Sequence, residues 1–400
     1  MIITFIQERT ENTMSKTLAF TPPMGWNSWN TFTSDINEEL IKGAADAMVE
    51  TGLKDAGYEY IVIDDCWSLR ERDENGFLVA DPVKFPNGMK AVADYVHSKG
   101  LKFGMYSCAG VYTCAGYPSS FEHEFQDAQT FASWGVDFLK YDYCYKPTQI
   151  NGDLLYKRMA MALRNCGREI LFSACNWGAD GVHNWIRETG AHMFRSTGDI
   201  QDSWQSIKNL ALSQMGKQSQ NGNHCWNDID MLVVGMYGGS NNGFIRASEF
   251  GCTDVEYKTH FSLWAMMNSP LMIGCDIRNM NDATKEILMN KDIIAINQDP
   301  DGRAPYDLNI NLWGHDVGKI LVRPLANGDY AVGFFNLSDR HIGFTNLLFW
   351  DIGFPYNSGY ALEFYDCWEH KTVGTFRERF AVDSLEAHEC KVYRVKLVKI

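Results

Sequence analysis

The sequence lacks the marks of several protein classes. It contains no run rich in Lys and Arg, and its 50 acidic residues outnumber 36 basic ones, which gives a net charge of −14. A surface that follows nucleic-acid phosphates is therefore not expected, and we predict no nucleic-acid partner. The chain also has no stretch of 18 consecutive apolar residues, so the sequence predicts no membrane-spanning helix and no membrane partner.

Cysteine is too sparse for a scaffold held together by disulfides. The 400 residues include 11 cysteines, an odd number, so at least one thiol is unpaired within the chain. The first residues, MIITFIQERTENTMSKT, show neither the basic segment nor the small-residue cleavage site of a secretory signal. We therefore expect a cytoplasmic protein, and the sequence leaves open whether it starts at Met1 or Met14.

Motifs of common cofactor and metal chemistry are also missing. The chain has no CxxC, HExxH, Walker A or GxSxG motif, and its 10 histidines form no ligand set. The glycine-rich segment 238–243 lacks the lysine of a phosphate-binding loop, so we expect a flexible loop there. Aromatic residues, in contrast, make up 13% of the chain, and their flat apolar faces suit either a core or sugar rings.

Apolar runs typical of strands alternate with segments of helical periodicity from residue 20 to residue 304. This order is typical of βα units around a parallel sheet, and eight such units fit a (β/α)8 TIM barrel. An open doubly wound sheet is the alternative, but it normally has fewer strands and a glycine-rich turn after the first. The predicted strands are 24–28, 58–64, 101–107, 136–141, 170–174, 193–197, 225–232 and 271–273, and the predicted helices include 38–56, 89–99 and 121–134.

The pattern changes after the turn-rich segment 297–303. From residue 305 to 400, alternating strands and tight turns predict a C-terminal antiparallel β-sandwich domain. Its clearest hairpin pairs 319–325 with 329–336 through a turn at Asn327 and Gly328, and further strands are expected at 361–365 and 391–397. The predicted organisation is an N-terminal extension (1–19), a catalytic barrel (20–304) and a β domain (305–400).

Carboxylates follow four of the predicted barrel strands, where barrel enzymes keep their working residues. Helix capping or turn formation explains any single one of them. Lys140 and Asp142, however, lie two residues apart on one strand, so both side chains leave the same face, and the cation favours an ionised Asp142. The carboxylates are Asp64, Asp65, Asp142, Asp199 and Asp230; all except Asp199 would alternatively form a divalent-metal site, against which Lys140 argues.

Two separated carboxylates in an aromatic pocket are what the cleavage of a glycosidic bond requires. Asp64 and Asp65 offer acceptors for neighbouring hydroxyl groups. Arg195 lies four residues before Asp199, where it either fixes a substrate or acts as a counter-ion. Three tryptophans offer apolar faces for a sugar, although each is individually more typical of a core or rim position: Trp26, Trp67 and Trp177.

Five motifs together resemble glycoside hydrolase family 27, whose main activity is that of an α-galactosidase. The similarity runs in order from about residue 18 to the C-terminus. The motifs are PPMGWNSWN (22–30), IDDCW (63–67), FASWGVDFLKYDYC (131–144), RSTGDIQDSW (195–204) and NDIDML (227–232).

The resemblance implies a retaining double displacement on a terminal α-D-galactoside. The family's nucleophile falls on Asp142 and its acid/base on Asp199, with about 5 to 5.5 Å expected between the carboxyl groups. No cofactor or metal takes part, and the expected partner is a small oligosaccharide or galactoside. The family's sugar-binding residues fall on Trp26, Asp64, Asp65, Tyr106, Lys140, Cys175, Trp177, Arg195, Asp230 and Met231.

The cysteines depart from the family pattern. Ser34 stands near where secreted relatives have the partner of Cys66, so we expect Cys66 to be a free thiol. Cys114 and Cys144 match a pair that forms a disulfide at the pocket rim of relatives; we expect proximity, and a reducing compartment leaves the oxidation state open. Cys108 replaces an aspartate in the motif YSCAG, which we expect to alter the aglycone side or the pH profile.

Selectivity within the family favours galactose. Trp177 belongs to a bulky C-x-W sequence and is expected to crowd the 2-acetamido group of N-acetylgalactosamine, while Asp64 and Asp65 retain a pair that is altered in β-L-arabinopyranosidases. We therefore expect an exo-α-galactosidase for oligosaccharides such as raffinose or melibiose. The alternatives are an α-N-acetylgalactosaminidase, a β-L-arabinopyranosidase and a sugar-binding barrel without catalysis. The acidic surface and the barrel sidewalls permit a homo-oligomer without requiring one.

Overall fold

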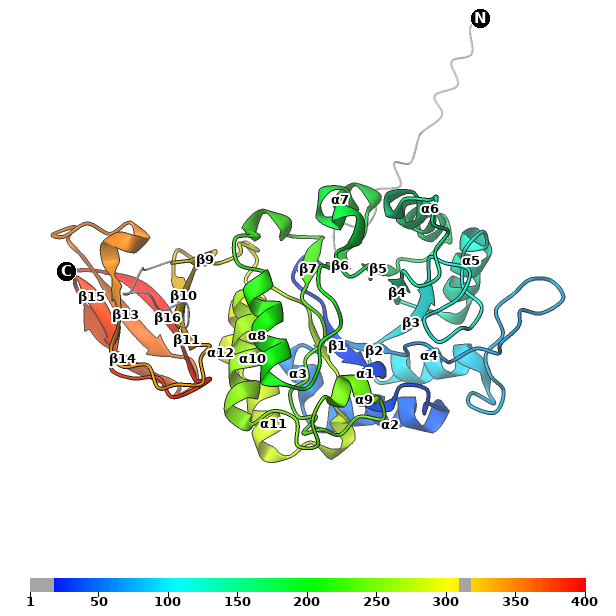
Figure 1. The fold of residues 1–400 in the computed structure, drawn as a ribbon, viewed down its shortest axis with the longest axis horizontal. Coiled ribbons are helices and arrows are strands. Elements are labelled where there is room, and N and C mark those ends of the chain that lie inside the picture. The colour runs from blue at the N-terminus through cyan, green and yellow to red at the C-terminus, as the bar shows by residue number, and fades with distance from the viewer. Residues whose placement is uncertain (1–17, 309–317) are drawn as a thin grey trace, which may run out of the picture.

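The computed structural model describes residues 18–308 and 318–400, drawn in colour in Figure 1. Most of the predicted N-terminal extension, including Met14, lies outside the described residues. None of the helices in the described part has the length and apolarity that crossing a membrane requires.

Eight parallel strands form one curved sheet in the order β7-β6-β5-β4-β3-β2-β1-β8. The ring closes just after β7, where Leu232 pairs in parallel with Ile273 and its amide donates to the Met272 carbonyl at 2.7 Å. The predicted barrel is confirmed. Its strands are β1 (Met24–Asn27), β2 (Tyr60–Val62), β3 (Lys102–Cys108), β4 (Phe138–Asp142), β5 (Leu171–Ala174), β6 (Met193–Arg195), β7 (Trp226–Asp228) and β8 (Leu271–Ile273).

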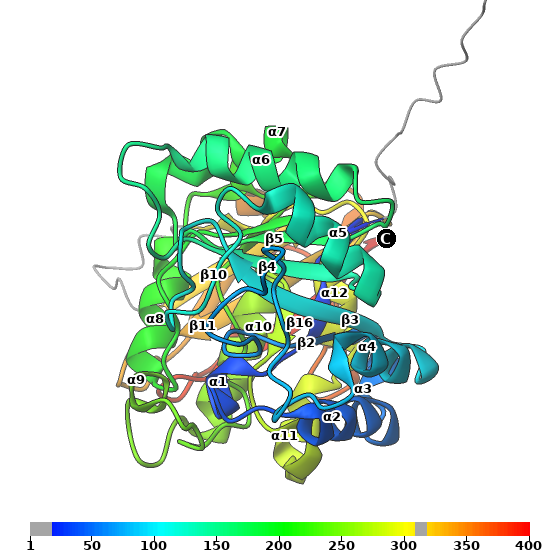
Figure 2. The same cartoon turned by 90° about the vertical axis from the view of Figure 1, so that its right-hand side faces the viewer.

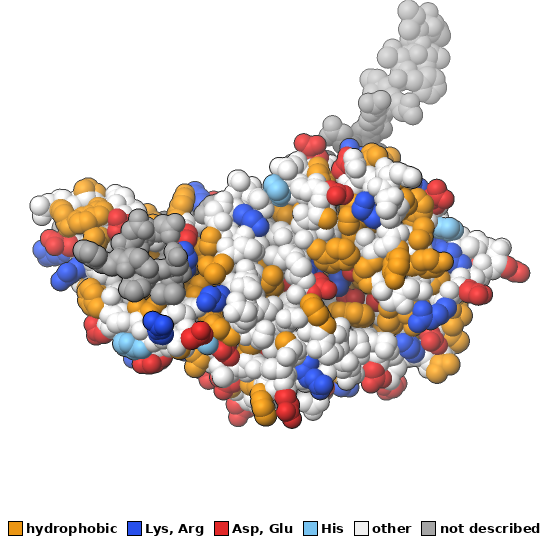
Figure 3. All heavy atoms as spheres, in the orientation of Figure 1, with side chains coloured by type: hydrophobic (Ala, Val, Ile, Leu, Met, Phe, Trp, Pro, Cys, Tyr) orange, Lys and Arg blue, Asp and Glu red, His pale blue; other side chains and the backbone are white. Residues whose placement is uncertain are grey.

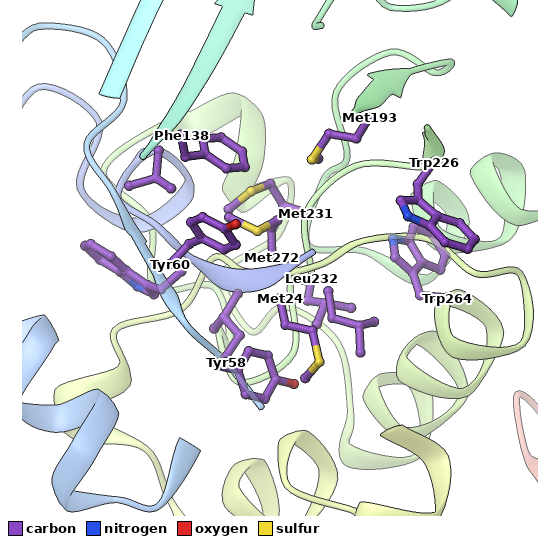
Figure 4. Packing of buried hydrophobic residues seen from close by; sticks show 14 of the residues in the cluster. Met24, Tyr58, Tyr60, Phe138, Met193, Trp226, Met231, Leu232, Trp264 and Met272 are labelled. Atoms are coloured by element: carbon purple, nitrogen blue, oxygen red, sulfur yellow. The ribbon is translucent and has the colours of Figure 1, made fainter. Parts of the chain in front are cut away.

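The barrel interior is filled by side chains, as expected for strands covered on both faces. Figure 4 shows Tyr60, Phe138, Met231 and Met272 among the buried residues of this cluster. The Tyr60 and Phe138 rings lie 5.3 Å apart between centroids. Met231 is 9% exposed, because it lies at the C-terminal ends of the strands, where the packed interior meets a pocket.

Helices cover the outside of the sheet (Figures 1 and 2). The prediction of one helix over 38–56 was wrong, because Gly52 adopts φ +89° and divides the segment into α2 and α3. The barrel helices are α1 (Trp29–Phe32), α2 (Glu38–Glu50), α3 (Leu53–Ala56), α4 (Gly88–Ser98), α5 (Glu124–Trp134), α6 (Gly152–Arg164), α7 (Ile186–Thr189), α8 (Trp204–Ser213), α9 (Gly243–Arg246), α10 (Asp254–Met266), α11 (Asp282–Leu288) and α12 (Lys291–Asn297).

The C-terminal domain consists of two antiparallel sheets, with orders β14-β13-β16-β11-β10-β9 and β12-β15. The predicted hairpin is confirmed: β10 pairs with β11, and the Gly328 amide donates to the Leu325 carbonyl at 3.0 Å. Aromatic side chains fill this second core, and the rings of Phe364 and Phe380 stack at 3.9 Å. The strands are β9 (Tyr306–Asp307), β10 (Gly318–Pro324), β11 (Tyr330–Asn336), β12 (Thr345–Leu348), β13 (Tyr360–Asp366), β14 (Lys371–Phe376), β15 (Arg379–Val382) and β16 (Cys390–Lys399).

The sandwich packs against the barrel on the side of α10 and α12 (Figure 1). Trp368 donates its indole N–H to the Ser262 hydroxyl at 3.1 Å, and Thr259 donates to the His388 carbonyl at 2.6 Å. The His388 ring stacks on Trp204, the first residue of α8, with 4.3 Å between the centroids. The two domains therefore share one continuous interface.

Candidate active site

A pocket opens at the C-terminal ends of the barrel strands. In the space-filling view of Figure 3, acidic side chains lie in a hollow over the barrel that is bordered by hydrophobic side chains. The pocket brings together all of the residues that the resemblance assigned to catalysis and sugar binding, except Trp26 and Cys175. It is lined by Trp29, Asn30, Asp64, Asp65, Tyr106, Cys114, Lys140, Asp142, Trp177, Arg195, Asp199, Asp230, Met231 and Ile245.

Asp142 is the last residue of β4 and lies deep in the pocket. Asp142 is only 6% exposed. The carboxylate accepts hydrogen bonds from the Tyr143 amide at 2.9 Å and from the Tyr106 hydroxyl at 3.2 Å. Burial raises the pKa of Asp142 to about 6, although the Lys140 ammonium acts in the opposite direction.

Lys140 lies beside these groups, half-buried, and forms an ion pair with Asp64, with 2.8 Å between Nζ and Oδ2. Asp64 also accepts hydrogen bonds from the Asn27 side-chain amide at 2.7 Å and from the Asp65 amide at 2.9 Å. The Asp64 carboxylate is thus held in place by three donors. Burial acts to lower the pKa of Lys140, but the neighbouring Asp64 carboxylate outweighs it, so this pKa is raised.

Asp199 lies between β6 and α8, at the open side of the pocket, and its side chain is 46% exposed. Arg195 joins it to a second carboxylate, because one guanidinium nitrogen lies 3.0 Å from Asp199 and the other 2.8 Å from Asp230. Burial acts to raise the pKa of Asp199, but Arg195 and Lys140 outweigh it, so this pKa is lowered. Arg195 therefore acts as the counter-ion that the sequence suggested as one of two roles.

Asp230 follows β7 in a strained backbone conformation, with φ +97°. Its carboxylate accepts from the Ile200 amide at 2.6 Å, next to Asp199 in the chain. Burial raises the pKa of Asp230 to about 6 against the opposing effect of Arg195. Trp177 also has a positive φ, of +58°, so two pocket residues carry backbone strain of the kind that clusters at functional sites.

The loops after β2, β3 and β4 are joined at the pocket rim. Asp65 accepts from the amides of Cys66 at 2.7 Å and Ala115 at 2.9 Å, and its burial raises its pKa. Cys114 and Cys144 form a disulfide with 5.1 Å between the Cα atoms, whereas Cys66 is a buried free thiol. The Cys108 thiol donates to the Cys144 carbonyl at 3.2 Å. Asp65 thus lines the pocket and also fixes a loop.

Two nominated residues lie behind the pocket wall. Trp26 is 1% exposed and donates its indole N–H to the Cys275 carbonyl at 2.8 Å. Cys175 is buried with its sulfur 3.7 Å from Arg195. Trp67, which the sequence offered as a sugar platform, packs against Trp134 at 5.7 Å in the core.

Sequence reasoning missed three lining residues: Trp29, Asn30 and Ile245. Trp29 and Asn30 follow β1 within the motif PPMGWNSWN, so the rule that strand ends carry the site applies to them too. Ile245 lies in α9, far from any strand end, and no pattern in the sequence marks it.

The strand ends of this eight-stranded βα barrel bring carboxylates, cations and aromatic side chains into one pocket. This is the arrangement of a barrel-type glycoside hydrolase. Residues 21–299 match the family model described as Alpha galactosidase A, and residues 318–395 match that of the Alpha galactosidase C-terminal beta sandwich domain. The chain belongs to the α-galactosidase family, glycoside hydrolase family 27.

Individual relatives agree with this assignment. Alpha-galactosidase 3 of Arabidopsis thaliana is 43% identical over 380 residues, which cover 94% of this chain and 82% of the relative. The crystal structure of α-galactosidase I from Mortierella vinacea has a TM-score of 0.85 at 35% identity, covering 95% of this chain and 98% of that one. An α-galactosidase structure from Saccharomyces cerevisiae with raffinose has a TM-score of 0.84 at 32% identity, with coverage of 95% and 98%. The chain is thus a hydrolase of terminal α-galactosyl residues.

Proposed function

We propose that this chain hydrolyses α-D-galactosides by a retaining double displacement, with Asp142 as the nucleophile and Asp199 as the acid/base. The observation that carries the assignment is the difference in exposure between the two carboxylates. Asp142 lies at the floor of the pocket and is 6% exposed, whereas the Asp199 side chain is 46% exposed at its open side. A sugar ring that fills the pocket meets Asp142 beneath it, and its leaving group meets Asp199.

The proposed reaction has two steps. In the first, a carboxylate oxygen of Asp142 bonds to the anomeric carbon, the glycosidic C–O bond breaks, and Asp199 gives its proton to the departing oxygen. In the second, ionised Asp199 takes a proton from water, the water oxygen bonds to the anomeric carbon, and the ester bond to Asp142 breaks. Each displacement inverts the anomeric carbon, so the product retains the α configuration.

The proton that this reaction needs is held by Asp230 and Asp199. Burial raises the pKa of Asp230 to about 6, and Arg195 lies between Asp230 and Asp199. Carboxylates that interact so closely bind a proton as a pair. A sugar that covers Asp199 removes water from it, which favours its neutral form and brings the proton to the leaving-group side.

Several contacts favour galactose and a small oligosaccharide. Asp64 is held by Lys140 at 2.8 Å, which leaves it oriented to accept from sugar hydroxyl groups. Trp177 lines the pocket and is 36% exposed, a position from which its ring would crowd a 2-acetamido substituent. The raffinose bound by the related S. cerevisiae enzyme supports galacto-oligosaccharides as the substrate class.

A cytoplasmic location is part of the proposal. Nine cysteines of the described residues are free, which fits a reducing compartment. Fractionation of cells that express the tagged full chain tests this, and activity found only in the secreted fraction would contradict it.

Product stereochemistry tests the two assigned roles. Asp142→Gly and Asp199→Gly are assayed with an activated aryl α-galactoside and azide. If Asp142 is the nucleophile, its loss leaves room for azide to attack directly and gives the β-galactosyl azide. Loss of the acid/base leaves the galactosyl intermediate intact, so azide attacks it and gives the α-galactosyl azide. The opposite pair of products would exchange the two roles.

Substrate comparison tests the glycone. The unmodified protein is expected to hydrolyse the aryl α-D-galactoside faster than the α-N-acetylgalactosaminide and the β-L-arabinopyranoside. Faster turnover of either of the latter two would overturn the galactose preference and leave the mechanism standing.

A further inference from the structure

The leaving group of a galactoside must lie beside the residue that protonates it. Under the proposed function, on which this inference rests, that residue is Asp199, in the segment between β6 and α8. The Asp199 side chain is 46% exposed, whereas Asp142 is 6% exposed, so the pocket is closed beneath the galactosyl ring and open beside the acid. The part of a substrate beyond its glycosidic oxygen therefore passes the elements that border the Asp199 segment.

The element bonded to this segment is the loop around α9. The Asp202 amide donates to the Ile245 carbonyl at 2.7 Å. Ile245 lies in α9 and lines the pocket together with Asp199. The loop that carries α9 thus forms the wall of the pocket on the acid's side.

Asp202 fixes both ends of this loop, which we call the α9 loop (residues 238–252). The fully buried Asp202 carboxylate accepts from the Gly238 amide at 2.8 Å and from the Cys252 amide at 3.2 Å. Gly251 packs so closely that a Cβ there would collide with the same carboxylate. The α9 loop is therefore held at its base by a residue of the acid segment itself.

The residue before Ile245 in α9 carries an exposed aromatic ring. Phe244, next to Ile245 in α9, is 55% exposed. Its ring contacts no aromatic ring or cation among the described residues. The amide of Phe244 is fixed by the Asn242 side chain at 2.9 Å, so the backbone that presents the ring is defined. Flat apolar rings of this kind bind the apolar faces of sugars.

We propose that Phe244 forms the binding surface for the leaving sugar of an α-galactosyl oligosaccharide. The α9 loop presents the ring, and Asp202 couples its position to that of the acid. Phe244 is a specificity-determining residue: it contacts the aglycone ring and does not touch the galactosyl group. The substrate class is an α-galactoside whose leaving group is itself a hexose ring.

The test compares two substrates that share the galactosyl group and differ in the leaving group. Melibiose releases glucose, and methyl α-D-galactoside releases methanol. Phe244→Ala is expected to lower kcat/KM for melibiose by about fivefold, the size of one stacking contact, and to leave kcat/KM for the methyl galactoside and the inhibition constant of free galactose unchanged. Phe244→Trp is expected to keep melibiose activity. Phe344→Ala, which removes an exposed ring from the C-terminal domain (59% exposed), is the matched control and is expected to change neither substrate.

The outcomes separate the inference from the proposed function. Equal losses on both substrates, or no loss on either, would overturn the role of Phe244, as would a selective loss in Phe344→Ala instead. Thermal unfolding of each variant shows that the fold is intact. Failure of the unmodified protein to hydrolyse either galactoside would overturn the proposed function, and the leaving-sugar surface with it.

Discussion

Lys140 forms its ion pair with Asp64, at 2.8 Å, and not with Asp142, two residues along the same strand. The expected influence on Asp142 nevertheless exists, because Lys140 opposes the rise in the Asp142 pKa that burial causes. Lys140 thus holds Asp64 by direct contact and favours the ionised form of Asp142, the proposed nucleophile, through space.

Replacement of Lys140 by Met should affect both carboxylates. Asp64 loses its charged partner within the pocket, and the pKa of Asp142 rises further because the opposing cation is gone. We expect kcat/KM for an aryl α-galactoside to fall by roughly 100-fold, the effect of one uncompensated buried charge, with the acidic limb of the pH profile moved to higher pH. Lys157→Met, on the exposed face of α6, is the control. An unchanged acidic limb would mean that Lys140 does not act on the nucleophile.

The pH dependence of kcat/KM should report the ionisation of the proposed nucleophile. Asp142 must be ionised to attack, and burial raises its pKa to about 6. Activity is therefore expected to decrease as the pH falls through about 6, and to decrease again at higher pH, where the acid/base has lost its proton. In Asp199→Asn, assayed with an activated leaving group, the alkaline limb should disappear. Its persistence would assign that limb to another group.

Asp202→Asn should weaken the base of the α9 loop. The Asp202 carboxylate accepts from the Gly238 and Cys252 amides and from the Tyr257 hydroxyl at 2.8 Å. An amide group keeps one acceptor and turns a donor toward a backbone N–H, so about 2 kcal/mol of unfolding free energy should be lost. Denaturant unfolding measures this, with the fully exposed Asp282→Asn as the control. We also expect a lower kcat for melibiose, because the segment that carries Asp199 loses its anchor. A free energy of unfolding equal to that of the unmodified protein would contradict the prediction.

Opening the Cys114–Cys144 disulfide should affect substrate binding more than chemistry. The bond joins the loops after β3 and β4, and the two sulfurs lie within 4.8 Å of an Asp142 carboxylate oxygen. Cys114→Ser is expected to raise KM severalfold with kcat changed less, because the rim loosens while Asp142 keeps its bond from the Tyr143 amide. Cys166→Ser, at a free cysteine outside the pocket, serves as the control. A loss confined to kcat would instead indicate a direct effect on the nucleophile.

The positions of the pocket carboxylates could be predicted from sequence because they depend on local pattern. An apolar run followed by Asp places that Asp at a strand end, and all barrel strand ends meet on one face. Asp64, Asp142 and Asp230 all line the pocket for this reason. The boundary between α2 and α3 was missed because helical periodicity continues across Gly52, whose positive φ alone divides the helix.

Contacts between distant segments could not be predicted in this way. Trp26 follows the strand-end rule, yet its ring is buried against the chain near Cys275, 249 positions away. The direction of a side chain at the end of a short strand depends on such neighbours. Ile245 enters the pocket from a loop that Asp202 binds, and neither residue type marks that relationship in the sequence.

The stacking of His388 on Trp204 limits how the chain can be divided. Trp204 begins α8, which follows the Asp199 segment directly, and His388 also bonds to Glu256 at the start of α10, at 2.8 Å. The β-sandwich is therefore a brace for the acid side of the pocket, and not an independent module that could be exchanged or cut away. Engineering that shortens this protein at the barrel boundary would have to rebuild that support from within the barrel.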